Sequence, residues 1–183
     1  TVRTGALSLS KFEVVAVKTV YLKIKQGEAF GLVGESGCGK STLAKMLVGL
    51  MKPTSGKIEI DGEIFDKPDP KIFGKKIQYV FQDPISSLNP RKTIRQIMEA
   101  PLKNLHGMKR PDRDSRIKEL FEAVNLRLDF VDRHPLEFSG GQAQRIGIAR
   151  TLSAEPEILV LDEPGTALDV SIQAKVLKLL EEP

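Results

Sequence analysis

Eight consecutive residues combine the types and the spacing that phosphate binding requires. The run from Gly34 to Ser41, Gly-Glu-Ser-Gly-Cys-Gly-Lys-Ser, fits the pattern G-x-x-x-x-G-K-S/T of a P-loop. Its glycines permit a tight bend in which successive backbone N–H groups point into one concavity. In such a loop the ammonium of Lys40 reaches the β- and γ-phosphates of a nucleotide, and the Ser41 hydroxyl ligates Mg²⁺. The residues predicted to contact the nucleotide here are Gly34, Glu35, Ser36, Gly37, Cys38, Gly39, Lys40, Ser41 and Thr42.

The segments on either side of this loop must hold it in place. Residues 29–33 form an apolar run typical of a buried strand, and residues 42–50 carry apolar side chains at helical spacing. The N-terminus of that helix would add partial positive charge to the loop. Upstream, apolar and polar residues alternate over 20–25, which predicts a half-exposed strand within a β-rich segment at 7–33.

The rest of the chain alternates between strands and helices. The predicted strands are 57–60, 63–65, 77–81 and 158–161, the first two joined by an Asp-Gly turn. The predicted helices are 93–126, 139–152 and 170–180, with a loop at 66–76 and an exposed linker at 106–114. We therefore predict one domain over 1–183, with an α/β core at 1–83 and 155–183 and a helical subdomain at 84–154.

Polar residues follow two of the predicted strands directly. Gln82 follows the strand at 77–81, and Asp162 and Glu163 follow the apolar run at 158–161. Ligands of open α/β sheets bind at the carboxyl ends of strands, so these residues are predicted to converge with the P-loop. Asp162 would hold Mg²⁺, Glu163 would polarise an attacking water, and Gln82 would contact metal or water. The predicted metal ligands are Ser41, Gln82 and Asp162, and the predicted catalytic residues are Glu163, Gln82 and Lys40.

A second glycine-bearing stretch separates this chain from a generic P-loop protein. Ser139 is a natural helix N-cap, and Gly140 and Gly141 permit the close approach of a γ-phosphate to the helix N-terminus. With Phe138 before it and Gln142 after it, the stretch resembles the signature of ATP-binding-cassette (ABC) ATPases. The P-loop, Gln82 and the apolar strand with its Asp-Glu pair match the other motifs of that family in the same order.

This resemblance implies a fold, two ligands and an assembly. The fold is a RecA-like P-loop NTPase core with an N-terminal antiparallel β part and an inserted helical subdomain, and the ligands are ATP and Mg²⁺. In that family two cassettes enclose the nucleotides, so Ser139, Gly140, Gly141 and Gln142 are expected to bind, in trans, the ATP of the partner. Asp169 is expected to contact the nucleotide as well. Phe12 is placed either to stack on the adenine ring or to pack in the core.

A narrower resemblance concerns the transported cargo. The runs from Phe81 to Pro84, from Ser87 to Arg91 and from Val170 to Ala174 resemble ATPase subunits of oligopeptide and dipeptide importers, and Arg91 and Phe138 resemble the second, F-type, subunit. The expected partners are a second ABC ATPase subunit, membrane permease subunits docked beside Gln82 and, indirectly, a peptide-binding protein. The expected location is the cytoplasmic side of the cell membrane. Nickel or a sugar oligomer remains possible as cargo within the same subfamily.

The chain also departs from the family pattern. Gly165 stands where the family usually has Thr, and Ala143 stands where a basic residue is common. The family places a switch histidine on a strand after the catalytic Glu, but His106 and His134 both precede Glu163. By this comparison the C-terminal part of the usual cassette is missing, and slow hydrolysis, or an ATP-binding fragment without turnover, is an alternative to an active ATPase.

Composition narrows the remaining alternatives. The net charge is +4, from 28 basic and 24 acidic residues that are dispersed along the chain, so no nucleic acid is expected as a partner. A DNA- or ribosome-associated ABC ATPase remains the other enzyme class. The interval between Lys40 and Ser139 has room only for a compact helical subdomain, which favours the transport subunit. The sequence has no apolar run long enough for a membrane span.

Overall fold

A computed structural model describes residues 15–65, 70–82 and 84–162 of the chain. The contacts between Cα atoms divide the chain into two compact units, residues 1–57 and residues 58–183. The predicted division into an α/β core and a helical subdomain at 84–154 stays a prediction.

The first unit contains one helix, α1 (Lys40–Leu47), within its described residues. The helix ends in a Schellman motif: Gly49 has φ of 69°, its N–H donates to the Met46 carbonyl at 3.0 Å, and the Leu50 N–H donates to the Lys45 carbonyl at 2.9 Å. The helix begins at the last glycine of the P-loop, so the predicted order of loop and helix is confirmed.

The prediction of strands at 20–25 and 29–33 is wrong, because residues 15–38 contain no strand. Val20, Leu22 and Ile24, whose alternation suggested a strand, are all exposed. A strand requires a neighbour that pairs with its backbone groups, and alternation alone does not supply one. Backbone hydrogen bonds in this stretch are local, such as the one from the Glu28 N–H to the Lys25 carbonyl at 3.1 Å.

The second unit begins with a two-stranded antiparallel hairpin, β1 (Glu59–Ile60) and β2 (Glu63–Ile64). The two residues between the strands, Asp61 and Gly62, have φ of 53° and 81°, which is the type I′ geometry that Asp-Gly favours. The predicted hairpin is therefore confirmed. The loop predicted at 66–76 is partly wrong, since Pro70–Lys76 forms helix α2 and the fixed φ of proline suits a first helical position.

A pair of parallel strands follows: β3 (Ile77–Val80) and β4 (Ile158–Leu161). Their register places Ile77 opposite Ile158 and Val80 opposite Leu161. The two strands lie far apart in the sequence, and the helices between them form the connection. Both predicted strands are confirmed; Asp162 directly follows β4, and Gln82 is the second residue after β3.

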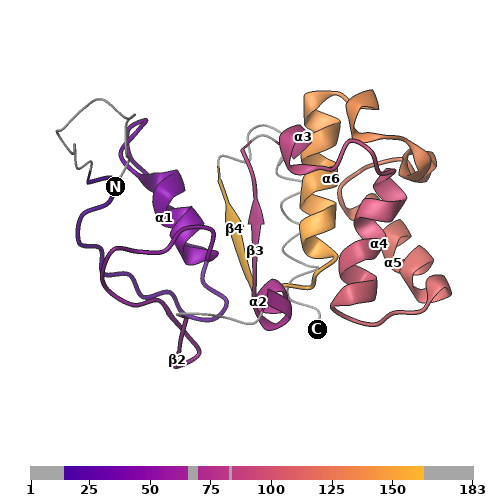
Figure 1. Ribbon diagram of the computed structural model, residues 1–183. Helices are drawn as coiled ribbons and strands as arrows, with labels where there is room; N and C mark the ends of the chain where they lie inside the picture. Colours follow the sequence, from indigo (N-terminus) through magenta and orange to yellow (C-terminus); the bar gives the residue numbers. More distant parts are fainter. Residues whose placement is uncertain (1–14, 66–69, 83, 163–183) are drawn as a thin grey trace, which may run out of the picture. The chain divides into compact units, whose positions relative to one another are not determined.

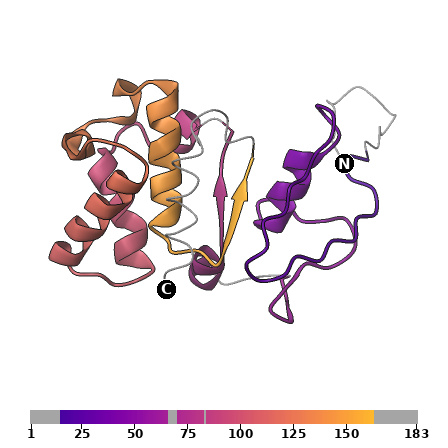
Figure 2. The same cartoon turned by 180° about the vertical axis from the view of Figure 1, so that it is seen from behind.

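Helices fill the interval between these strands. They are α3 (Pro84–Ser87), α4 (Ile94–Asn104), α5 (Arg110–Ala123), the 3₁₀ segments η1 (Leu128–Asp132) and η2 (Pro135–Glu137), and α6 (Gly140–Leu152). Figures 1 and 2 both show α6 between the β3–β4 pair and the helices α4 and α5. The predicted linker at 106–114 is shorter than expected, because α5 already begins at Arg110 with Pro111 in its first turn.

The core of the second unit lies among these helices. Phe121, Ile94, Met98 and Ile146 are completely or almost completely buried, and they belong to one apolar cluster that includes Val80 of β3. A Thr93 cap fixes the start of α4: its hydroxyl accepts from the Gln96 N–H, and the Gln96 side chain accepts from the Thr93 N–H. The cluster therefore anchors α6, whose first residues are candidate ligands of ATP, to the strand that leads to Gln82.

Candidate functional site

The P-loop curls around the ammonium group of its own lysine. The Nζ atom of Lys40 donates hydrogen bonds to the carbonyl oxygens of Gly34 at 2.7 Å and Glu35 at 2.9 Å. The Sγ atom of Cys38 lies 3.9 Å from the same nitrogen. Lys40 thus lies inside the loop, where the motif predicts that it meets phosphate oxygens. Anionic phosphates are stronger acceptors than neutral carbonyls, so they can replace these contacts.

Gly39 shows why the loop requires glycine at its junction with α1. Its φ is 101°, in the left-handed region, and a Cβ atom added there would collide with the backbone carbonyl of Ala16. Gly37 also has a positive φ, 81°, but a Cβ atom there would meet open space. The conformation at Gly39 is therefore set by backbone geometry and by close packing together.

Asp162 is the best-defined candidate at the sheet edge. It follows β4, only 8% of its surface is exposed, and its N–H donates to the Val80 carbonyl at 3.1 Å, which extends the ladder of the two strands. The hydroxyl of Tyr79 donates to Asp162 Oδ2 at 2.5 Å. Burial, together with this hydrogen bond to the carboxylate, raises the pKa of the Tyr79 phenol well above its ordinary value.

Gln82 lies at the same edge of the strand pair. Because Val80 lies opposite Leu161 in a parallel register, Gln82 and Asp162 both follow the carboxyl ends of adjacent strands. Gln82 is exposed. The predicted proximity of these two strand ends is thus present in the second unit. The P-loop belongs to the first unit.

The signature stretch forms the N-terminus of α6. The Ser139 hydroxyl accepts from the Gln142 N–H at 3.4 Å, and Gln142 Oε1 accepts from the Ser139 N–H at 3.1 Å, which is a capping box. Gly140 and Gly141 are exposed, and a Cβ atom on either would meet no other atom within 4 Å. Internal packing does not require these glycines, which leaves this helix end open to the approach of another molecule.

Three predicted site residues, Phe12, Glu163 and Asp169, lie outside the described residues. The two histidines have structural contacts: His106 Nε2 lies 3.0 Å from the Ala154 carbonyl oxygen, and the His134 N–H donates to Glu137 Oε1 at 2.6 Å.

Sequence reasoning missed Tyr79, because its contact with Asp162 depends on the pairing of β3 with β4. The available signal was the position of Tyr79 within the predicted strand that leads to Gln82.

The chemistry of the candidate metal ligands fits Mg²⁺. The Ser41 hydroxyl, the Gln82 amide and the Asp162 carboxylate all offer oxygen atoms, which Mg²⁺ prefers, and the phosphates of a nucleotide complete such a set. No cluster of three or more His, Cys, Asp or Glu side chains suited to a metal ion occurs among the described residues. In the same part of the chain, none of the helices has the length and apolar character needed to cross a membrane.

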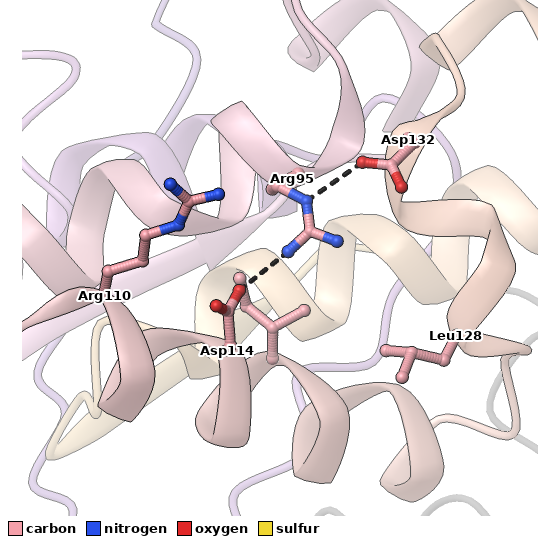
Figure 3. Close-up of a pocket in the computed structure, with 6 residues that line it drawn as sticks. Arg95, Arg110, Asp114, Leu128 and Asp132 are labelled. Carbon is pink, nitrogen blue, oxygen red and sulfur yellow. Dashed lines mark hydrogen bonds and ion pairs between the residues drawn. The ribbon is translucent and has the colours of Figure 1, made fainter.

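Two cavities lie among the helices. One, of about 440 Å³, is lined by Arg95, Arg110, Asp114, Leu128 and Asp132 together with Ile117. Figure 3 shows Arg95 there between two carboxylates, with hydrogen bonds to Asp114 at 2.8 Å and Asp132 at 2.9 Å. Asp114 and Asp132 offset the charges of Arg95 and Arg110, so the lining carries no excess positive charge for a phosphate. It contains none of the predicted site residues.

The second cavity, of about 330 Å³, runs beside α3 and is called here the Arg150 groove. Its polar lining includes Gln78, Ser87, Asn89, Lys92, Gln96 and Arg150. The guanidinium of Arg150 donates to the Ser87 carbonyl at 3.1 Å, and burial lowers the pKa of this group. Part of its lining, from Ser87 to Lys92, follows Gln82 in the chain, and Lys92 and Arg150 give it two cationic side chains.

Comparison with known proteins agrees with this geometry. A family model described as ABC transporter matches residues 17–166, so the chain belongs to that family. The structure resembles a dimeric, post-hydrolysis structure of the ATP-binding cassette MJ0796 bound to ADP and Pi, with a TM-score of 0.80 and 36% identity over 91% of this chain and 74% of that one. The predicted fold class, an ABC-type P-loop NTPase, is confirmed.

The curated relatives include oligopeptide transport and nickel import ATP-binding proteins. The chain is 47% identical to the oligopeptide transport ATP-binding protein AppF of Bacillus subtilis, over 99% of this chain and 56% of that protein. It is 48% identical to OppF of Escherichia coli, over 91% and 51%, and 44% identical to the nickel import protein NikE of Shigella boydii, over 97% and 68%. The chain spans about half the length of the oligopeptide relatives that it matches.

Proposed function

We propose that this chain binds and hydrolyses ATP to drive the import of peptides through a membrane permease. The observation that carries the proposal is the P-loop with Lys40 held inside it, on a chain whose relatives include several oligopeptide transport ATP-binding proteins. The ATPase activity, the cargo and the partners rest on these relatives, which are longer than this chain.

Each proposed role follows from the chemistry of a side chain. Lys40 binds the β- and γ-phosphates, and the backbone N–H groups of residues 34–42 bind the remaining phosphate oxygens. Ser41, Gln82 and Asp162 hold Mg²⁺, which when bound neutralises charge on the phosphates. Glu163 orients and polarises the attacking water. In a dimer, the exposed N-terminus of α6 at Ser139 binds the γ-phosphate on the partner subunit.

The partners follow from two surfaces of the second unit. The exposed signature glycines support a second ATPase subunit as the partner at the N-terminus of α6. The Arg150 groove, whose lining includes the segment from Ser87 to Lys92 shortly after Gln82 in the chain, supports docking of a permease there and a location on the cytoplasmic side of the membrane. A peptide-binding protein would act only through the permease.

Nucleotide binding is tested first, by calorimetry with ATP. We expect Lys40→Ala to weaken ATP binding by about tenfold or more, because a charge-assisted contact worth about 1.5–3 kcal/mol is lost. Lys45→Ala, in the last turn of the same helix, is the matched control and should leave the affinity unchanged. Equal affinities of the two variants would contradict the P-loop assignment.

Hydrolysis is tested by phosphate release. Glu163→Gln should retain Mg-ATP binding and reduce the rate by about 10²–10³, the range seen when one positioned charge-stabilising group is removed. Unchanged release would show that another group acts as the base. ATP binding by the unaltered chain without any release would favour the alternative of a binding unit without turnover.

Docking and cargo are tested together in cells that contain the permease. Lys92→Glu places a negative charge in the Arg150 groove and should reduce peptide uptake, while ATP binding by the isolated chain persists. Lys103→Glu, an exposed position at the other end of α4, is the control. Normal peptide uptake by the Lys92 variant would refute docking at this groove. Uptake of nickel in place of peptide would favour the function of the NikE relative.

A further inference from the structure

The hydrogen bond between Tyr79 and Asp162 joins a residue with no assigned role to the carboxylate at the end of β4. Tyr79 is 6% exposed and Asp162 is 8% exposed, so both polar groups are withdrawn from water. A buried carboxylate and a buried hydroxyl each need a partner, and here each supplies one to the other at 2.5 Å. A phenylalanine would fill the volume of the ring, so packing does not explain the hydroxyl.

The strand register explains how the two groups meet. Tyr79 lies opposite Val160, and Asp162 follows two residues later on the same face of the strand pair. The long phenol side chain reaches along the strand to the carboxylate. Its ring also packs edge-on against Phe81, with centroids 4.7 Å apart and an interplanar angle of 83°. Tyr79 therefore contacts Asp162 and also the residue that directly precedes Gln82.

We propose that Tyr79 is a positioning residue for Asp162 and thereby sets the Mg²⁺ dependence of nucleotide binding. The hydroxyl holds the carboxylate in one orientation, and the ring contact with Phe81 couples that orientation to the start of the Gln82 segment. Groups that hydrogen-bond to metal ligands commonly change metal affinity by about 10–100-fold when they are removed. This inference rests on the proposed binding of Mg-ATP, and it adds a residue and a measurable consequence to it.

The first experiment measures how the binding of a non-hydrolysable ATP analogue depends on the Mg²⁺ concentration. We expect Tyr79→Phe to require roughly tenfold more Mg²⁺ for the same affinity, while its affinity in excess EDTA equals that of the unaltered chain. Tyr21→Phe is the matched control, since Tyr21 is 94% exposed and has no place in the site. Equal Mg²⁺ dependence of the unaltered chain and Tyr79→Phe would overturn the proposal.

The second experiment leaves Tyr79 in place and alters only the exposed Tyr21, so it does not depend on how well a variant of the buried Tyr79 folds. The chain has two tyrosines and no tryptophan, so Tyr79 is the sole tyrosine after Tyr21→Phe. We expect its emission, excited where adenine does not absorb, to change when Mg²⁺ is added to the complex with the analogue. Unchanged emission would overturn the proposal. An unaltered chain that binds no nucleotide, with or without Mg²⁺, would instead refute the proposed function itself.

Discussion

In residues 15–57 the buried apolar side chains are Ala44 and Val48, whereas α4, α5 and α6 together bury a continuous apolar cluster. The first region contains the P-loop, whose contacts are made by backbone carbonyls and glycines. The second contains the signature stretch, whose exposed glycines stand at the end of a deeply anchored helix. The two candidate ATP-contacting elements thus differ in what holds them: backbone contacts in the P-loop, and apolar burial around α6.

This difference predicts which substitutions affect stability and which affect ligand binding. Apolar burial contributes about 25 cal/mol per Å² of surface removed from water, so the helical cluster carries a large share of the stability of its unit. A glycine loop contributes little burial, and its function depends on backbone conformation. Substitutions should therefore affect stability mainly in the helices, and should affect ligand binding mainly in the loop.

The largest effect on stability is expected for Phe121→Ala. Phe121 is completely buried in the helical cluster, and such a truncation costs about 3–5 kcal/mol because it removes apolar contacts and leaves a cavity. The corresponding change in the first region, Tyr21→Ala, should cost less than about 0.5 kcal/mol, since that side chain is exposed. Urea unfolding monitored by circular dichroism measures both. Equal losses would mean that the two regions share one kind of core.

A smaller effect is expected for Gly39→Ala in the P-loop. Alanine pays about 1–2 kcal/mol in the left-handed region, and here its Cβ atom would also meet the Ala16 carbonyl. Gly37→Ala provides the control, because it has the same class of backbone conformation with open space around it. We expect Gly39→Ala to lower the free energy of unfolding more than Gly37→Ala does. The reverse order would show that the contact with Ala16 is unimportant.

The same two regions show what a sequence can predict. The helical periodicity of 93–126 and 139–152 is local, and it predicted α4, α5 and α6 with errors confined to their boundaries, as at Arg110. The Asp-Gly turn predicted the hairpin for the same reason, because its geometry depends on two adjacent residues. Local signals of this kind need no knowledge of the rest of the fold.

Features that depend on distant pairing were predicted less well. The alternation at 20–25 suggested a strand. However, a strand forms only when two segments pair, and residues 20–25 form no strand. The apolar run at 158–161 correctly predicted β4, and Asp162 directly follows that strand. The contact between Tyr79 and Asp162 could not be predicted, because it requires the register of β3 against β4.

Ser139→Ala separates the structural role of the signature stretch from its proposed role toward ATP. Loss of an N-cap side chain costs about 1 kcal/mol. Thr93→Ala removes the equivalent cap of α4 and should cost a similar amount, since both residues form capping boxes. Only Ser139→Ala should weaken ATP-dependent dimerisation, which sedimentation in the presence of Mg-ATP would measure. Equal effects of the two variants on dimerisation would confine Ser139 to its structural role.

The smallest effect is expected at the cavity shown in Figure 3, where Arg95 joins α4 to α5 and η1 through ion pairs. The hydrogen bond from Arg95 to Asp132 is the main cause that raises the pKa of Arg95, so the guanidinium stays charged throughout the working pH range. However, the Asp132 side chain is 73% exposed, and exposed ion pairs contribute about 0.2–1 kcal/mol. Asp132→Asn should therefore lower the free energy of unfolding by less than about 1 kcal/mol.

Salt distinguishes this ion pair from the apolar cluster. At about 1 M salt the screening length falls to about 3 Å, so the difference between Asp132→Asn and the unaltered chain should nearly vanish. The loss caused by Phe121→Ala should persist, because screening does not act on apolar contacts. Urea unfolding of both variants at low and high NaCl makes the comparison. A loss at Asp132 that approached that of Phe121→Ala and resisted salt would mean that the Arg95 pairs, and not only the apolar cluster, hold the helices together.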